Sequence, residues 1–217
     1  MGVLKGFLIL LQDESLGPLA SPKQRQAVST MLRNVNALIN MIQKYLQLGR
    51  IESGRMEITK TRVQVFLEAL APVLEDEKKQ IELRKIQVIL EGEEAFAKVE
   101  AVADTMLLRI VFSNLIGNAL KYGCEGGKIW CGMREQPGEW LFYIKNEGRG
   151  IPVDKLEAIF EKFARLEGEL ERRRRGTGLG LFNARVIVEK HGGRIWAESK
   201  EGAWANFLFV LPKEEKS

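Results

Sequence analysis

The chain is poor in the residues that build metal centres and disulfide frameworks, and it has no long apolar segment. Its 217 residues include one histidine and two cysteines. Cys124 and Cys131 form neither a CxxC pair nor part of a metal-ligand cluster, so we expect two free thiols. No apolar run approaches the roughly 20 residues that span a bilayer.

No secretory signal is recognisable at the N-terminus. The apolar stretch GVLKGFLILL leads into QDES without a small-residue cleavage site. We therefore expect a cytoplasmic location for these residues. The sequence leaves open a membrane anchor upstream of Met1, so any membrane association would come through segments absent from this chain.

Positive charge is concentrated in one place, the run RRRR at residues 172–175, although the net charge is only +4. Acidic residues precede the run (EGELE), and no aromatic platform or groove-reading helix accompanies it. We therefore expect no nucleic-acid partner. Arginines close to the phosphates of a nucleotide fit the context better.

The first 55 residues read as a helical hairpin. Leu4, Phe7, Leu8 and Leu11 have helical spacing, and the glycine–proline pair at 17–18 breaks that helix. Ser21 begins a capping box with Gln24, so a second helix should run from there to about residue 53. We assign residues 1–55 to this hairpin and residues 56–217 to a second domain.

The second helix carries an a/d heptad seam, which favours a homodimer. Its apolar residues step by 4, 3, 4, 3 and 4: Val28, Leu32, Val35, Ile39, Ile42 and Leu46. Two copies of the hairpin would bury such a seam in a four-helix bundle. The alternative is that the seam packs on the chain's own second domain.

From residue 56 helical and strand patterns alternate, which predicts an α+β sandwich with an antiparallel-rich sheet covered by helices on one face. We expect helices at 62–80, 103–123, 152–163 and 179–190. Strands are expected at 85–90, 127–133, 139–146, 193–199 and 204–212.

Four short stretches of this domain could form a nucleotide site, and the first is NLIGNALKYG. Asn114 and Asn118 share one face of a helix, and amide oxygens are suitable ligands for Mg²⁺. Lys121, with Tyr122 beside it, could meet a phosphate as a point charge. The alternative for the two asparagines is an ordinary role on the helix surface or in capping.

The second stretch is IKNEGRGIP, where a strand ends at Asn146 and two glycines follow. Gly148 and Gly150 allow a tight turn and would let a flat ring approach the backbone. The alternative is a plain strand-to-helix turn, because a lone GxG is weak support for a binding site.

The third and fourth stretches flank a charged loop. In IFEKFAR, the Phe160 and Phe163 rings could clamp this loop onto the core, or simply belong to the core, and Arg165 could reach phosphates. In RGTGLGL, glycines 176, 178 and 180 precede a helix whose bare amides could hold phosphate. This stretch is not a Walker motif, because no GK[ST] follows.

Together and in this order, the four stretches resemble the N box, first glycine box, F box and second glycine box of sensor histidine kinases, within the group that includes gyrase, Hsp90 and MutL. The resemblance covers roughly residues 56–212. The preceding hairpin resembles the dimerisation and histidine-phosphotransfer domain of the same family. The resemblance to sensor histidine kinases implies that the chain binds ATP and Mg²⁺, forms a homodimer, and has a response regulator receiver domain as its partner.

The resemblance also implies roles for individual residues. Asn118 would hold the metal, and Asn114, Lys121 and Arg165 would act at the phosphates. The nucleotide would further contact Tyr122, Asn146, Gly148, Gly150, Ile151, Phe163, Arg175, Gly176, Thr177, Gly178, Leu179, Gly180 and Leu181.

Two positions depart from related patterns. Asn146 stands where the family most often has Asp, so it can accept a hydrogen bond from the adenine amino group only without charge. ATP-hydrolysing relatives place a Glu where Asn114 stands. Because Asn114 cannot take a proton from water, we expect transfer to a histidine rather than hydrolysis. The alternatives are a pseudokinase that binds without transfer and, less favoured, a non-kinase ATPase.

The acceptor histidine of such a kinase is missing from the expected region. Asp13 could replace it if QDESLGPL aligned with the family's SHELRTPL. Alternatively, the chain opens at the far end of the first helix, and the histidine lies upstream of Met1. The second alignment leaves more room for the helix, so we favour it. His191 should end a helix, where a partly positive ring suits the dipole.

Overall fold

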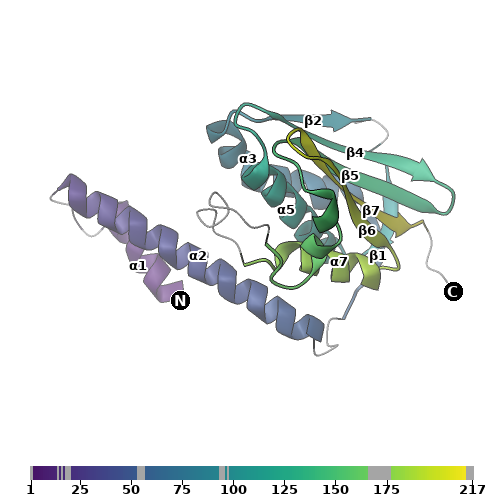
Figure 1. Cartoon of the computed structure of the whole chain (residues 1–217). Helices are drawn as coiled ribbons and strands as arrows, with labels where there is room; N and C mark the ends of the chain where they lie inside the picture. The colour runs from purple at the N-terminus through teal and green to yellow at the C-terminus, as the bar shows by residue number, and fades with distance from the viewer. Residues whose placement is uncertain are drawn as a thin grey trace. The chain divides into compact units, whose positions relative to one another are not determined.

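The computed structural model describes residues 2–13, 15, 17, 21–52, 57–92, 96, 98–165 and 177–213. Backbone proximity divides the chain into two compact units, Met1–Arg55 and Met56–Ser217, and each is taken by itself here (Figure 1). Among the described residues, no helix is both long enough and apolar enough to cross a membrane.

The first unit is a pair of helices, α1 (Gly2–Gln12) and α2 (Pro22–Glu52), that pack against each other. The predicted capping box is confirmed. The Ser21 N–H donates to Gln24 Oε1 at 3.0 Å, and the Gln24 N–H donates to Ser21 Oγ at 3.3 Å. The first bond satisfies the Ser21 amide, and the second adds to the bond that the Gln24 N–H makes to the Ser21 carbonyl at 3.1 Å.

Within the described part of this helical pair, the two helices leave many large apolar side chains exposed. Within the described side chains, Leu8 and Val28 are buried, whereas Leu32, Val35 and Ile39 of the seam are half-buried. Leu46 lies outside the described side chains. Large apolar side chains that remain exposed are Val3, Leu4, Phe7, Ile9, Leu10, Met31, Leu38 and Ile42.

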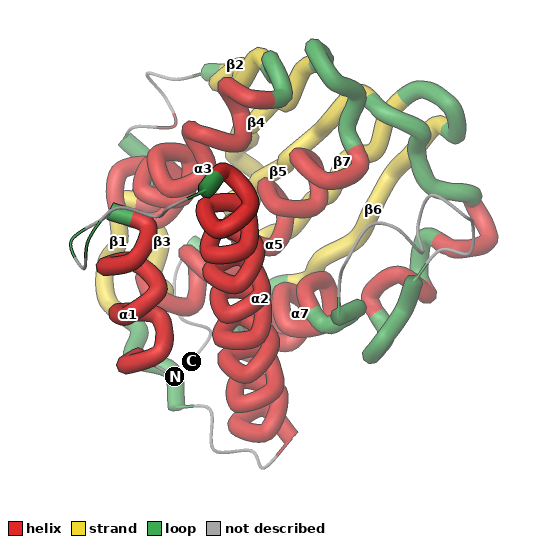
Figure 2. The backbone as a smooth tube through the Cα atoms, turned by 90° about the vertical axis from the view of Figure 1, so that its left-hand side faces the viewer, coloured by secondary structure: helices red, strands yellow, loops and turns green. Residues whose placement is uncertain are grey.

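The second unit is a five-stranded sheet with helices on one face, as predicted (Figures 1 and 2). The strand order is β2-β4-β5-β7-β6, with β2 parallel to β4 and the other pairs antiparallel. The strands are β2 (Gln87–Glu91), β4 (Lys128–Gln136), β5 (Glu139–Glu147), β6 (Arg194–Lys200) and β7 (Trp204–Pro212). The helices are α3 (Ala71–Leu83), α5 (Thr105–Tyr122) and α7 (Gly180–Lys190).

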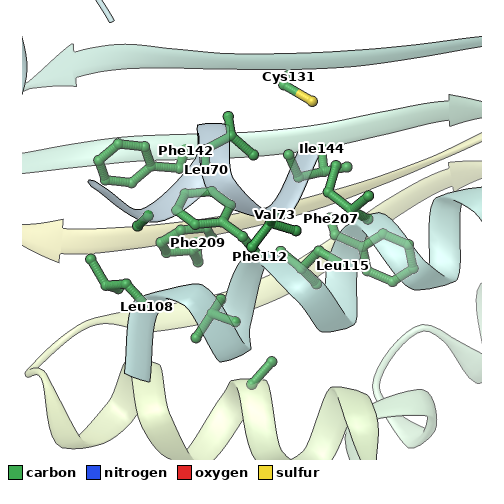
Figure 3. Packing of buried hydrophobic residues seen from close by; sticks show 14 of the residues in the cluster. Leu70, Val73, Leu108, Phe112, Leu115, Cys131, Phe142, Ile144, Phe207 and Phe209 are labelled. Atoms are coloured by element: carbon green, nitrogen blue, oxygen red, sulfur yellow. The ribbon is translucent and has the colours of Figure 1, made fainter. Parts of the chain in front are cut away.

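The core lies between these helices and the sheet and is rich in phenylalanine (Figure 3). Phe209 of β7 lies 5.1 Å from Phe142 of β5 and 5.5 Å from Phe112 of α5, measured between ring centroids. All three rings are fully buried. Truncation of one such ring to alanine typically costs about 3–5 kcal/mol. This packing fixes α5, which carries the first of the candidate motifs.

The helix predicted at 62–80 begins later than expected. Residues Thr61–Gln64 form a short strand, β1, that pairs antiparallel with β3 (Glu100–Ala103), which we had not predicted. Val63 is completely buried there. A π-helical turn, η1 (Val65–Leu70), then leads into α3. Local periodicity favoured the helix, but pairing with a strand far along the chain prevails.

The helix predicted at 152–163 is also wrong. Only two short 3₁₀ turns occur there, η2 (Val153–Lys155) and η3 (Ala158–Phe160). The helical spacing of the apolar residues is real, because Phe160 is buried and Leu156 and Ile159 pack against the core. The segment nevertheless turns twice to follow the surface rather than forming one continuous helix.

His191 caps the C-terminal end of α7, but not as the partly positive ring that we predicted. The ring is 2% exposed, its Nδ1 lies 2.7 Å from the Ile187 carbonyl oxygen, and the Asp104 N–H donates to Nε2 at 3.0 Å. Because that amide can only donate, Nε2 must accept and Nδ1 carries the proton. Burial lowers the pKa of His191, against smaller raising effects of the Ile187 carbonyl and the Asp104 carboxylate.

Candidate functional site

The first candidate motif lies on α5, whose start is fixed by Asp104, which accepts from the Leu107 N–H at 3.0 Å. Asn114 and Asn118 are both half-buried on this helix. Asn114 Nδ2 donates to the Ile110 carbonyl at 2.9 Å, which orients its amide. Among the described residues, no hydrogen bond involves the side chain of Asn118, so its amide is available to a ligand.

The second glycine box meets this face of α5. A Cβ added to Gly180, the first residue of α7, would lie 2.7 Å from Asn114 Oδ1, so a side chain at this position would displace the Asn114 amide. Leu179 before it offers no side-chain cap, which leaves the first amides of α7 without a side-chain partner from that position. A helix N-terminus of this kind attracts anions. The amide oxygen of Asn114 and the start of α7 are thus brought together.

The end of α5 presents a cluster of cations around an aromatic ring. Lys121 Nζ lies 4.7 Å from the centre of the Tyr122 ring, and the Arg149 guanidinium carbon lies 4.9 Å from it. Such contacts hold positive charge close to an aromatic surface. Arg149 was missed by the sequence reasoning, because nothing marks the middle residue of a GxG stretch as functional.

Asn146 ends the buried part of β5 and is only 3% exposed. Its Nδ2 donates to the Glu147 carbonyl at 3.0 Å. That same carbonyl accepts from the Cys124 N–H at 3.0 Å, in the loop that follows α5. The first glycine box and the end of the N box therefore lie side by side, joined also by the isolated bridge between Gly123 and Gly148.

Both glycines of the first box lie against neighbouring backbone, and the predicted positive φ is confirmed at Gly150. A Cβ on Gly148 would lie 2.6 Å from the Tyr122 carbonyl oxygen, and one on Gly150 would lie 2.3 Å from the Lys200 carbonyl oxygen. Gly150 also has a φ of +68°, which favours glycine. The Cβ positions are thus occupied by neighbouring backbone, so close chain packing requires glycine at both positions.

The F box is joined to the second glycine box through the backbone. The Phe163 N–H donates to the Gly178 carbonyl at 3.1 Å, and a Cβ on Gly178 would lie 2.6 Å from the Phe163 backbone. Phe160 is 4% exposed and belongs to the core. Phe163 is 53% exposed, so the alternative in which both rings belong to the core is wrong for Phe163. Phe163 also has an unusual φ of +62°.

The remaining predicted residues fall into three groups. Ile151 and Leu179 are buried and Leu181 is half-buried against the core, so these side chains contribute packing. Thr177 Oγ1 accepts from the Leu179 N–H at 3.4 Å, and Arg165 is exposed. Arg175 and Gly176 lie outside the described residues.

The polar side chains described above are mainly amides and cations, which bind ligands through hydrogen bonds and charge. In the described part of the chain, no group of three or more histidine, cysteine, aspartate or glutamate side chains could hold a metal ion. A cation here would need amide oxygens together with oxygens of its own ligand, an arrangement typical of Mg²⁺ bound with phosphates. Asn114 has an amide side chain, which cannot act as a base.

Comparisons with known proteins show the family to which the chain belongs. Residues 103–215 match the family described as histidine kinase-, DNA gyrase B-, and HSP90-like ATPase. The sensor histidine kinase WalK of Bacillus subtilis (strain 168) is 32% identical over 185 residues, which cover 82% of this chain and 29% of WalK. The chain spans less than half the length of the curated relatives that it matches first.

Solved structures share the fold of the chain. Full-length ShkA in complex with AMPPNP aligns with a TM-score of 0.76 and 22% identity, over 98% of this chain and 42% of ShkA. Histidine kinase ThkA in complex with the response regulator protein TrrA aligns with a TM-score of 0.63 and 22% identity, over 97% of this chain and 57% of ThkA. With the matched region covering more than half of the sequence, the chain belongs to the histidine kinase-, DNA gyrase B- and HSP90-like ATPase family and is homologous to sensor histidine kinases.

Proposed function

We propose that this chain is the dimerising, ATP-binding core of a sensor histidine kinase, which binds Mg²⁺–ATP and transfers the γ-phosphoryl group to a histidine upstream of Met1. The observation that carries the proposal is the meeting of Asn114 with Gly180 at the start of α7. This contact places an amide side chain and bare helix amides at one point, which suits a polyphosphate. The AMPPNP bound to ShkA supports a nucleotide of this class.

Mg²⁺ would be held by Asn118 together with phosphate oxygens. The residues present fit this ion, because Asn118 is half-buried and its amide makes no hydrogen bond to other described residues. When bound, the ion neutralises charge on the phosphates during transfer. Lys121, one turn further along α5, would add a second positive charge on the same side.

The base of the nucleotide would meet the other end of α5. Asn114 and Tyr122 are eight residues apart, which is about 12 Å along a helix axis. Tyr122 lies against the first glycine box, where Asn146 is the one strongly buried polar side chain of β5 among the described residues. Asn146 Oδ1 would accept from the base, and the Tyr122 ring with Arg149 would flank it.

Transfer to histidine is favoured over hydrolysis because Asn114 has an amide side chain, which cannot take a proton from water. Asp13 is a poor candidate for the acceptor. Its N–H donates to the Ile9 carbonyl at 2.9 Å, and it follows the last residue of α1, so it stands in a turn rather than on a helix face. This position supports the second alignment, in which the histidine precedes the chain.

The proposed partners are a second copy of the chain and a response regulator receiver domain. Exposed apolar side chains on both α1 and α2, such as Phe7 and Ile42, would be covered in a four-helix bundle. The complex of ThkA with TrrA supports a response regulator as the recipient of the phosphoryl group. Relay would then proceed from the histidine to an aspartate of that partner.

The proposal is tested by labelling with γ-³²P-ATP, comparing this chain with a form extended upstream to include the histidine. We expect acid-labile, base-stable label on the extended form only. If this chain took up label that hydroxylamine removes, and if Asp13→Ala lost that label, then Asp13 would be the acceptor. This result would contradict the assignment of an upstream histidine as the acceptor. An extended form that binds ATP but takes no label would instead favour a pseudokinase, the alternative that the uncharged Asn146 motivates.

A further inference from the structure

We propose that the face of the sheet opposite the helices docks an acidic protein segment, whose carboxylates bind cations held over an aromatic layer. The aromatic layer consists of four side chains from β4, β5, β6 and β7: Trp130, Tyr143, Trp196 and Trp204. The helices α3, α5 and α7 lie on the other face of the sheet (Figure 1). The inference goes beyond the proposed function, because it assigns a further partner to residues that the candidate nucleotide site does not include.

The strand register places these side chains on one face of the sheet. Side chains alternate between the two faces along a strand, and residues directly opposite each other in neighbouring strands share a face. Lys145 of β5 lies opposite Trp130 on one side and opposite Asn206 on the other. Five side chains of this face form a cluster of their own, apart from the core beneath the helices: Leu141, Tyr143, Leu208, Val210 and Trp196.

Every ring of the aromatic layer has a cation close to its centre. Lys145 Nζ lies 4.8 Å from the centre of the Trp204 ring and 5.5 Å from that of Trp130. The guanidinium carbons of two arginines are placed similarly: Arg134 lies 5.5 Å from the Tyr143 ring, and Arg194 lies 5.6 Å from the Trp196 ring. Attraction between a cation and an aromatic ring holds positive charge at the surface of the layer.

The carboxylates of this face already accept hydrogen bonds within the chain, whereas three of its cations have no carboxylate partner. The carboxylates and their donors are Glu139 with Arg194, Glu91 with the Tyr143 hydroxyl, Glu147 with the Lys128 N–H, and Glu198 with the Trp196 indole. Among the described residues, no ion pair joins a carboxylate to Arg134, Lys145 or Lys200. These three cations are therefore available to the carboxylates of a partner.

The form of this surface favours a protein over a membrane or a nucleic acid. Leu208 and Val210 are buried, and none of the described large apolar side chains that are exposed lies on this face, so it offers little to insert into a bilayer. A Cβ on Gly132 would overlap the Tyr143 ring, which therefore lies across β4. Because each ring already carries a cation, the bases of a single strand would find little open ring surface for stacking.

A protein surface rich in carboxylates suits both features of this face. Carboxylates form charge-assisted hydrogen bonds with lysine and arginine. Tryptophan, tyrosine and arginine are the side chains most enriched at protein interfaces. The aromatic layer would supply the contact area, and Arg134, Lys145 and Lys200 would select an acidic partner.

The test measures binding of a deca-glutamate peptide to the whole chain by tryptophan fluorescence, since three of the four tryptophans lie in the aromatic layer. Lys145→Glu combined with Lys200→Glu should weaken binding about tenfold or more at low salt. Lys79→Glu combined with Lys98→Glu is the matched control, because both lysines are exposed outside this face and the net charge changes equally. The control should bind the peptide as the wild type does.

Equal loss of binding in the two double variants would overturn the proposal, because net charge alone would then attract the peptide. Absence of binding to the wild type at millimolar peptide would also overturn it. So would binding of phosphatidylglycerol vesicles or of oligo-dT, in place of the peptide, that Lys145→Glu with Lys200→Glu abolishes. If that variant does not fold, backbone NMR of the wild type decides: the peptide should shift the amide resonances of β4, β5 and β7 and leave those of α3 unchanged.

Discussion

Gly180, the first residue of α7, lies so close to Asn114 of α5 that a Cβ on it would be 2.7 Å from Asn114 Oδ1. Gly180→Ala should therefore push the Asn114 amide out of place while leaving the backbone of the helix intact. We expect ATP affinity to fall about tenfold, which corresponds to about 1.4 kcal/mol. Calorimetric titration measures this loss.

Gly117→Ala is the matched control on the same helix. A Cβ on Gly117 would meet nothing within 4 Å, and alanine is favoured over glycine inside a helix. The variant should bind ATP as the wild type does and gain about 0.5–1 kcal/mol in the free energy of unfolding. Equal loss of affinity in both variants would show that the contact between Gly180 and Asn114 does not position the site.

The neutral His191 makes stability depend on pH. The pKa of His191 is lower in the folded chain than its ordinary value of 6.5, because burial disfavours the charged ring. The neutral ring therefore makes its full contribution to the free energy of unfolding above pH 6.5. This contribution is lost as the pH falls through the lower pKa that His191 has in the folded chain. The free energy of unfolding, measured by urea denaturation, should be lower at pH 5.5 than at pH 7.5.

Replacement of the ring separates this effect from other titrating groups. His191→Phe removes the bonds to Ile187 and Asp104, which should cost about 1–3 kcal/mol for each group left unpaired. The variant should also lose most of this pH dependence, because phenylalanine has no ring nitrogen that takes up a proton. If the free energy of unfolding changed equally with pH in the wild type and in His191→Phe, His191 would be ruled out as the source of the pH dependence.

The two cysteines should react very differently with thiol reagents. Cys131 is fully buried, and burial raises the pKa of its thiol to about 12, so it should stay unreactive in the folded chain. Cys124 is exposed beside the first glycine box. One thiol per chain should react natively and two in denaturant. Mg²⁺–ATP should slow the native reaction, and Cys124→Ser should abolish it.

The exposed apolar surface of the helical hairpin predicts a dimer. Light scattering should give about twice the chain mass of 24.6 kDa. Ile42→Lys places a charge on an apolar residue of α2 that is 42% exposed in the single chain, and it should yield monomers. Thr30→Lys, the same change at an exposed polar position of α2, should leave the dimer intact. Monomeric wild-type chain at micromolar concentration would contradict the seam interpretation.

Local signals in the sequence predicted the elements that depend on neighbours in the chain. The capping box of Ser21 located the start of α2, and alternation predicted the paired strands β4 and β5. The pairing of β1 with β3 was missed, because residues 61–64 merge into an amphipathic pattern and their partner lies about 40 residues away. Such non-local pairing leaves no periodic trace in either segment.

The candidate site could be predicted as a set of motifs but not as a geometry. The asparagines and glycines were visible in the sequence, whereas the reason for the glycines lies in backbone from distant segments, such as Lys200 against Gly150. Arg149 at Tyr122 and the orientation of Asn146 by Glu147 depend on contacts that no spacing rule records. The neutral state of His191 likewise depends on Asp104, 87 residues away.

Titration of the chain with ATP, with and without Mg²⁺, tests the central claim most directly. We expect ATP binding that Mg²⁺ strengthens and that Asn118→Ala weakens about tenfold or more in the presence of the ion. Gly117→Ala should bind as the wild type does. Absence of binding at millimolar ATP, or binding that responds neither to Mg²⁺ nor to Asn118→Ala, would contradict the proposal of a kinase site.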